Sequence, residues 1–332
     1  MEASKVAPVG SIVMPIVVAV VAALLPRFGA SSYVQILVYY TAYYLALGQA
    51  WNLMSGMTGY VSFAHGALAG IGSYATVMAL NAGWTLAPAV LAGAVVALLA
   101  SLVIGLTSLR LRGISFTFTT LFFQALALQI LRKLPATGGP GGLTLEEILP
   151  IWLPQLLMIA LACTATLVML LVRHSRMGLR LLAIKGDETA ALSLGIASAR
   201  LKLAVFCASA AIAGAAGAVH GLFTASLYPD IVFSVDVSLI ALAVPLIGGA
   251  ATAFGPVVGA LFYVGIGELL AVYAPSVHVV AVGAVLLTVM LFMPGGLLPF
   301  LTERTKQKRR RGEPRAVRRR GEPRAVTREV KQ

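Results

Sequence analysis

Charged residues are scarce in this chain. Asp, Glu, Lys and Arg make up 11% of its 332 residues, whereas a soluble globular protein carries about 25%. Hydrophobic residues account for 59% of the chain. This composition excludes an ordinary soluble domain and indicates an all-α integral membrane protein. The length accommodates about ten transmembrane helices of roughly 20 residues each, with short connections and no large soluble domain.

Sites for disulfides, metals and nucleotides are also lacking. The two cysteines, Cys163 and Cys207, lie in apolar runs and fit small buried residues better than a disulfide or a metal pair. No histidine cluster has metal-ligand spacing, and no Ser/His/Asp arrangement supports an intramembrane enzyme. The Gly-rich loop at 137–143 is no phosphate-binding loop, because the chain contains no Gly-Lys pair. We therefore predict no catalytic residue, no metal site and no cofactor on this chain.

Ten apolar runs are separated by polar or Gly/Pro-rich turns. The first run is followed by more spans and by no clear small-x-small cleavage site, so we interpret it as an uncleaved span. Residues 1–10 form a short stub, 11–300 the transmembrane domain and 301–332 a separate tail. The predicted spans are 11–25, 33–53, 56–79, 86–109, 114–134, 151–172, 201–223, 237–249, 257–273 and 278–293.

The tail is strongly basic. Residues 303–332 contain 13 Lys or Arg and four Glu, so they carry +9 of the net charge of +13. Its nine residues Arg309–Val317 recur as Arg318–Val326. A charged segment with so few apolar residues cannot form a core, and we predict that it is disordered and attracted to anionic lipid. The tail has no aromatic residue for stacking on single-stranded nucleic acid, so we predict no specific nucleic-acid partner.

One long charged segment, residues 173–202, lies between the first and last spans. It contains six Lys or Arg and two acids. Because basic residues near span ends are retained on the cytoplasmic side, we expect this segment to face the cytoplasm. Counting spans then places both termini on that side as well. Arg27, Arg132 and Lys133 fall on the outer side, against the rule.

The same segment predicts a short helix. Asp187 and Glu188 stand where such a helix would begin, and they complement the positive end of its dipole. Apolar residues follow at helical spacing, and Gly195 is placed as a left-handed stop. A short amphipathic helix held between two spans is suited to docking in a groove on a partner. The alternative is a solvated loop whose charges only set the topology.

The segment resembles the cytoplasmic coupling loop of ATP-binding-cassette importer permeases, where a Glu-Ala-Ala-like helix followed by Gly docks onto the ATPase. The matching residues here are 187–191 and Gly195. Over residues 45–300 the chain resembles the branched-chain amino-acid permeases of the LivM type. Ala64 and Ala251 stand where that family more often has Gly. The matching motifs occur in the family's order, within 51–74, 112–121, 137–142, 176–196, 206–217 and 248–256.

The resemblance implies a type II-like importer permease bundle in the bacterial inner or plasma membrane. It implies branched-chain or other hydrophobic amino acids as substrates. The implied partners are ATPase subunits that use ATP, a second homologous permease subunit, a periplasmic or extracellular substrate-binding protein, and membrane lipid. We expect Ala191→Arg and Gly195→Glu to uncouple ATP hydrolysis from uptake. The residues expected to couple to the ATPase are Arg176, Gly178, Arg180, Asp187, Glu188, Ala190, Ala191 and Gly195.

Polar residues at membrane depth are candidates for the translocation path, because exposing them to lipid is costly. Of the ionisable ones, His65 meets substrate or bonds to a neighbouring helix, and Glu268 lies at the interface or in the bundle interior. Tyrosines inside the span 33–53 are expected to face other helices or a cavity. A short span that ends in glycines also fits a path, since irregular backbone needs protein or water around it. The candidates are Asn52, Ser62, His65, Gln124, Gly248 and Gly249.

Two alternatives stay open at the level of sequence. An ion-coupled secondary transporter needs an ionisable midplane site, and only His65, His220 and Glu268 are available for it. The resembled family is also associated with urea, amides and aromatic acids, and no residue here discriminates among these substrates. The sequence equally leaves open whether the second permease subunit is a copy of this chain or a homologue.

Overall fold

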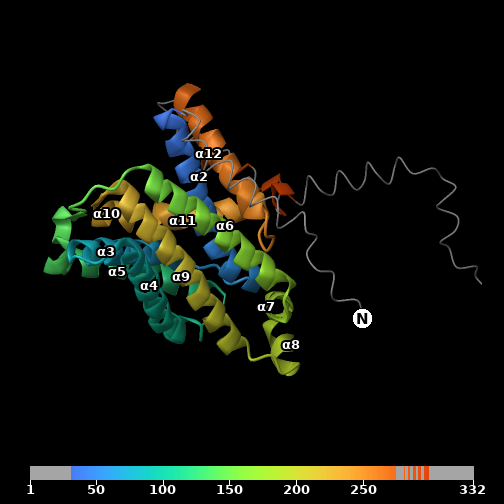
Figure 1. Ribbon diagram of the computed structural model, residues 1–332. Helices are drawn as coiled ribbons and strands as arrows, with labels where there is room; N and C mark the ends of the chain where they lie inside the picture. Colours follow the sequence, from blue (N-terminus) through green and yellow to red (C-terminus); the bar gives the residue numbers. More distant parts are fainter. Residues whose placement is uncertain are drawn as a thin grey trace, which may run out of the picture.

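The computed structural model describes residues 31–111 and 113–273, and beyond them only isolated positions between 280 and 298. The described part is almost entirely helical, as Figure 1 shows. Four predicted segments lie wholly or mostly outside the described residues, namely the stub 1–10, the spans 11–25 and 278–293, and the tail 301–332.

Six helical segments of the described chain are long and apolar enough to cross a membrane, so ten spans are not confirmed. α10 and α11 together form one of the six. α2 and α3 fall outside this set, and they are the helices rich in Tyr and in Gly. The elements are α2 (Ser32–Trp51), the π-helical turn η2 (Asn52–Gly56), α3 (Ala64–Asn81), α4 (Leu86–Ser108), α5 (Ile114–Lys133), the 3₁₀ turns η3 (Pro135–Thr137) and η4 (Gly139–Gly141), β1 (Leu143–Thr144), α6 (Trp152–His174), α7 (Arg176–Gly186), α8 (Glu188–Ser193), α9 (Ser198–Thr224), β2 (Ser226–Leu227), α10 (Pro229–Val232), α11 (Val235–Gly248) and α12 (Gly255–Tyr273).

The prediction of a helical membrane protein is confirmed, and the described part adds one short strand pair to it. β1 and β2 form an antiparallel pair in which Leu143 lies opposite Leu227. Each strand has two residues, too few for strand alternation to be visible in the sequence. The pair joins the two connections predicted on the outer side. Beside it Arg132 forms an ion pair with Asp230, so this basic residue has a local counter-ion.

The span predicted at 56–79 begins later than expected. The helical conformation of α2 continues through η2 as far as Thr58. The chain then leaves it at Gly59, whose φ of +79° is in the left-handed region that glycine adopts without steric cost. α3 starts only at Ala64. We call the segment from the π-helical turn η2 to the start of α3, residues 52–63, the α2–α3 break.

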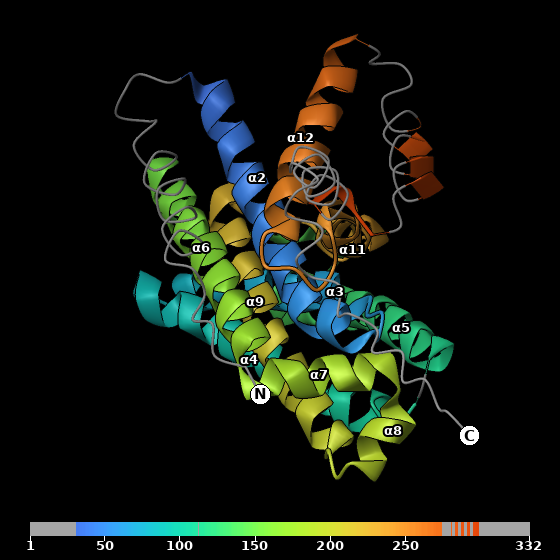
Figure 2. The same cartoon turned by 90° about the vertical axis from the view of Figure 1, so that its right-hand side faces the viewer.

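α9 is the central helix of the bundle. α3 and α4 pack along it, and α2 packs against α6, α9, α11 and α12 (Figure 2). Glycines allow the backbones of α3 and α9 to approach closely. A Cβ atom built on Gly72 would lie 2.1 Å from the Gly214 carbonyl oxygen, and one on Gly217 would lie 1.8 Å from the Ala69 oxygen.

The close approach of α3 and α9 allows a prediction about the stability of the fold. We expect Gly217→Ala to lower the free energy of unfolding by about 1–3 kcal/mol, because the added methyl group forces α3 and α9 apart. The measurement is the thermal midpoint of the detergent-solubilised protein. Gly265→Ala in α12 is the matched control, because a Cβ atom there meets nothing within 4 Å. Equal midpoints for the two variants would contradict the close contact.

α9 also sets the distance between the two ends of the bundle. It starts next to α8 and ends at β2, and its 27 residues span about 40 Å. α7 and α8 therefore lie at the opposite end of α9 from the strand pair, as Figure 1 shows.

Candidate functional site

Residues 173–202 contain two helices, α7 and α8, which we call the α7–α8 hairpin. Before α7, the Ser175 Oγ atom accepts a hydrogen bond of 3.2 Å from the Gly178 N–H. The predicted short helix is α8, capped by Asp187, whose Oδ1 atom accepts from the N–H groups of Thr189 (2.8 Å) and Ala190 (3.1 Å). The predicted left-handed stop is also present, at Gly195 with a φ of +78°. The prediction missed α7.

A buried ion pair fastens α8 to the bundle. The Lys202 Nζ atom donates to the Glu188 Oε1 atom over 2.7 Å, and the Lys202 side chain is only 2% exposed. The Tyr60 hydroxyl donates to the second carboxylate oxygen of Glu188. The Lys202 Nζ atom also lies 4.1 Å from the centre of the Tyr60 ring, within cation–π range. This cluster joins α8, α9 and the break between α2 and α3.

α7 contacts the same break. The Lys185 Nζ atom donates to the Gly56 carbonyl oxygen over 2.9 Å. Burial, together with the nearby Arg173 charge, lowers the pKa of Lys185. Gly59 leaves room for this side chain, because a Cβ atom there would lie 3.3 Å from the Lys185 Cγ atom. Both helices of the hairpin are thus bonded to the α2–α3 break.

Asn52 links this break to a second break, between α11 and α12. Its Oδ1 atom accepts from the Ala251 N–H, and its Nδ2 atom donates to the Thr252 carbonyl oxygen, each over 2.7 Å. A side chain at Gly56 would occupy the same space, because its Cβ atom would lie 2.1 Å from Asn52 Oδ1. Ala251 itself has a φ of +61°, a conformation that glycine adopts more easily.

The Asn52 hydrogen bonds predict that replacing this side chain lowers the free energy of unfolding. We expect Asn52→Leu to leave the backbone groups of Ala251 and Thr252 without partners, at about 1–3 kcal/mol for each buried group. The measurement is the thermal midpoint of the solubilised protein. Asn81→Leu is the matched control, since the Asn81 amide donates to the Thr144 carbonyl oxygen and accepts from the Glu146 N–H in bonds that are exposed to solvent. Equal losses in the two variants would contradict the cost of leaving the buried partners of Asn52 unpaired.

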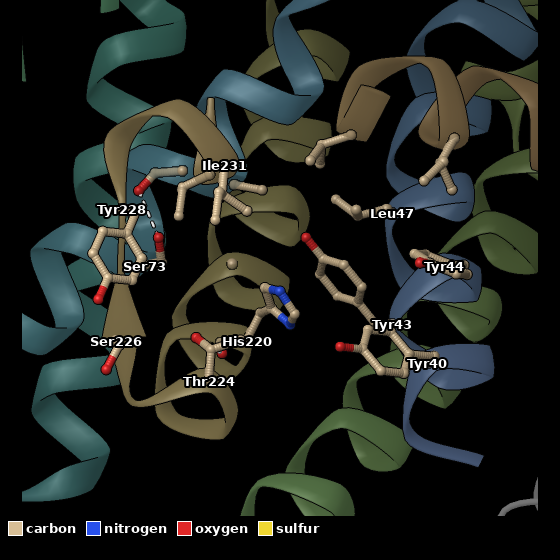
Figure 3. Close-up of a pocket in the computed structure, with 16 residues that line it drawn as sticks. Tyr40, Tyr43, Tyr44, Leu47, Ser73, His220, Thr224, Ser226, Tyr228 and Ile231 are labelled. Atoms are coloured by element: carbon tan, nitrogen blue, oxygen red, sulfur yellow. Dashed lines mark hydrogen bonds between the residues drawn. The ribbon is translucent and has the colours of Figure 1, made fainter. Parts of the chain in front are cut away.

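A cavity of about 140 Å³ lies at the other end of the bundle, between α2, α3, α9 and the chain from β2 into α11 (Figure 3). The rings of Tyr43 and His220 stack in it with their centres 4.2 Å apart. The Tyr39 hydroxyl lies 3.1 Å from the His220 Nδ1 atom, behind the cavity wall. The cavity is consistent with the expectation that the tyrosines of 33–53 face helices or a cavity.

Comparison with known proteins decides the family. The family model described as "Branched-chain amino acid transport system / permease component" matches residues 32–293. The chain belongs to this family. Two relatives, the high-affinity branched-chain amino acid transport system permease proteins LivM of Salmonella typhimurium and Escherichia coli, are each 27% identical to it over 310 residues. These matches cover 81% of this chain and 70% of each relative. No solved structure matches the chain.

The permease is therefore a multi-pass membrane subunit of an ATP-binding-cassette importer and not an enzyme. In such a system ATP is used by a partner ATPase, and the permease component has no cofactor of its own. The family match favours the importer over the ion-coupled secondary transporter that the sequence left open.

The predicted coupling residues of the permease divide by exposure. Glu188 is largely buried in its ion pair, and Gly178 and Ala191 are buried. Leu194, which was not among the predicted coupling residues, is also exposed, with 80% of its side chain open to solvent. A groove of about 410 Å³ runs past Leu194 between Arg180 and Arg200. Arg200 is likewise not among the coupling residues predicted from the sequence. The exposed predicted residues are Arg176, Arg180, Asp187, Ala190 and Gly195.

The six predicted translocation-path residues are buried in packing contacts, and none lines the cavity at Tyr43 and His220. His65 Nε2 lies 3.2 Å from Ser209 Oγ on α9. Gln124 donates to the Ser234 carbonyl oxygen over 2.6 Å. The other four form the two breaks: Asn52 and Ser62 in the α2–α3 break, and Gly248 and Gly249 at the end of α11.

Glu268, left open between interface and interior, is partly exposed on α12 and bonds to Tyr33 at the start of α2. Sequence reasoning did not identify His220 and Tyr43 as partners. The available signal was the density of tyrosines in α2 together with one histidine in a small-residue helix.

Proposed function

We propose that the permease forms one half of the translocation pathway for branched-chain or other hydrophobic amino acids. The observation that carries this proposal is the α7–α8 hairpin, which ends the bundle in an exposed surface and is bonded to the α2–α3 break. Asn52 in turn bonds that break to the α11–α12 break. The two relatives are named as branched-chain amino acid permease proteins, which supports the substrate class.

The proposed ATPase contact is the exposed side of the hairpin. Leu194 is 80% and Leu192 44% exposed, so a partner that covered them would remove apolar surface from water. Arg180 and Arg200 flank the adjoining groove and suit an acidic rim on the partner. A helix-in-groove contact of this kind uses apolar anchors surrounded by charges. We include the exposed predicted residues Arg176, Asp187, Ala190 and Gly195 in this surface.

The proposed transmission path consists of direct bonds. A displacement of α8 pulls on Tyr60 and Lys202 through Glu188, and a displacement of α7 pulls on Gly56 through Lys185. From the α2–α3 break, Asn52 carries the movement to the α11–α12 break. Rigid helices joined at two irregular breaks are suited to rocking between two packings, outward-facing and inward-facing. Gly248 and Gly249 lie where α11 would have to tilt.

We propose that the hairpin and both termini face the cytoplasm, in accordance with the basic charge of 173–202. The Arg132–Asp230 ion pair supports this orientation, because it neutralises a basic residue on the proposed outer face. A substrate-binding protein would then meet the strand-pair end. A second permease subunit, homologous or identical, would complete the pore, with lipid around the outer helices and the basic tail at the inner surface.

The test is transport by the whole complex. The permease is co-expressed with the ATPase, second permease and binding protein of its own transport system, and the complex is reconstituted in proteoliposomes. We expect leucine uptake that requires ATP, and ATP hydrolysis that is stimulated by the leucine-loaded binding protein. Urea, amides and aromatic acids serve as competitors. Uptake that persists without ATP and is abolished by a protonophore would overturn the proposal in favour of a secondary transporter.

A further inference from the structure

The cavity at Tyr43 and His220 has two chemically different ends. Aliphatic side chains of α2, α10 and α11 form one end, with Leu47 and Ile231 among them. Tyr40, His220 and Thr224 lie toward the other end. Figure 3 shows Tyr43 and His220 side by side between these ends, with Leu47 and Ile231 on one side of them and Thr224 on the other. A cavity of this kind suits a small amphiphilic solute.

Its size sets a second limit on the occupant. The volume of about 140 Å³ is well below the roughly 300–1,000 Å³ of pockets for drug-sized ligands. It is close to the roughly 150 Å³ of an engineered apolar cavity, in another protein, that binds benzene. The cavity therefore fits a solute with a handful of carbon atoms.

Charge sets a third limit. No Asp, Glu, Lys or Arg lines the cavity within the described chain. A solute with a net charge would lose its hydration there without gaining an ionised partner, which is costly. A zwitterion has no net charge, and each of its two charged groups can be met by neutral groups: an ammonium by the faces of tyrosine rings, and a carboxylate by N–H or O–H donors.

The hydrogen bond behind the cavity wall orients such a donor. Tyr39 is fully buried, and its hydroxyl lies 3.1 Å from His220 Nδ1, the one hydrogen-bond partner that the described residues offer it. Buried hydroxyl donors are normally satisfied, so Tyr39 donates and Nδ1 accepts. The ring proton of a neutral His220 is then on Nε2. His220 retains partial exposure while lining the cavity, and no described residue bonds to Nε2.

We propose that this cavity is a transit site for a small neutral amino acid, in which His220 Nε2–H binds the carboxylate, the tyrosine rings receive the ammonium and the aliphatic end holds the side chain. Tyr39 is a positioning residue that holds the His220 tautomer. The inference rests on the proposed function, and it adds a site within this subunit and a reason for its selection against solutes with a net charge.

Photo-leucine, whose diazirine reacts with whatever surrounds the side chain, tests the location in the reconstituted complex. We expect labelling of peptides that contain Leu47 or Ile231, with protection by excess leucine. Labelling confined to other segments, in a complex that still takes up leucine, would overturn the transit site and leave the proposed function intact. Absence of any amino-acid uptake by the complex would instead overturn the proposed function, and with it this inference.

Competition against photo-leucine labelling tests the roles of the residues. In the wild type we expect leucine to compete at least about tenfold better than leucinol, which lacks the carboxylate. His220→Leu should abolish this preference, His220→Gln should restore part of it through its amide N–H, and Tyr39→Phe should reduce it. Tyr74→Phe is the matched control, since its hydroxyl bonds to the Leu227 carbonyl oxygen away from the cavity. An unchanged preference in His220→Leu would overturn the assigned role.

Discussion

Glu188→Ala is expected to abolish coupled uptake. The substitution leaves the Lys202 ammonium buried without its counter-ion, and removing one partner of a buried ion pair costs about 3–5 kcal/mol. It also releases Tyr60, so α8 loses its bonds to α9 and to the α2–α3 break. The measurements are the thermal midpoint of the solubilised permease and leucine uptake by the reconstituted complex.

A double variant separates two effects of removing Glu188. One is the burial of an unpaired Lys202 charge, and the other is the loss of the bonds from α8 to α9 and to the α2–α3 break. In Glu188→Ala/Lys202→Met no charge is left unpaired, so most of the stability is expected to return. Uptake is expected to stay low, because the bonds that carry movement from α8 are still absent. Full uptake by the stable double variant would contradict the transmission path. A single variant as stable as the wild type would contradict the buried ion pair.

Leu194→Arg is expected to separate ATP hydrolysis from uptake without harming the fold. The side chain is 80% exposed, so the change should alter the free energy of unfolding by no more than about 0.5 kcal/mol. A charge at the centre of an apolar docking contact is costly once the contact removes water. We expect basal ATPase activity to remain, and its stimulation by loaded binding protein, together with uptake, to be lost.

The control for Leu194→Arg is Leu194→Met, which keeps an apolar side chain of similar volume and should support normal uptake. Normal stimulation and uptake in Leu194→Arg would exclude this residue from the ATPase contact. A large loss of thermal stability in Leu194→Arg would show that the side chain packs inside the protein.

Local signals explain why part of the hairpin was predictable. Asp187 caps α8 with its own side chain, and Gly195 ends the turn in a left-handed conformation, so both features depend only on neighbouring residues. Span positions such as α4 and α5 were similarly accessible, because long apolar runs need no partner to be recognised.

The burial and the bonding partners of the predicted coupling residues depend on tertiary contacts, which the sequence does not show. Glu188 was predicted as a coupling residue, and the structure gives it an internal ion pair with a lysine 14 positions away. Ala191 is only 2% exposed, so Ala191→Arg would displace α8 in addition to blocking a partner. Gly195→Glu also meets backbone strain at a φ of +78°. Neither variant tests docking as cleanly as Leu194→Arg.

The cavity was hidden for the same reason. Tyr43 and His220 are separated by more than 170 residues of sequence and meet only because α2 packs on α9. The break residues Asn52 and Gly249 looked like path-lining groups because polar and flexible residues at membrane depth serve both purposes. Only the bonds from Asn52 to Ala251 and Thr252 show that these residues join two breaks.

The most direct test of the account is photo-crosslinking from position 194 in the assembled transporter, with p-benzoylphenylalanine in place of Leu194. The account predicts an adduct between the permease and an ATPase subunit, with a yield that changes when ATP binds. Efficient incorporation into an active transporter with no ATPase adduct in any nucleotide state would contradict the claim that this hairpin receives the ATPase.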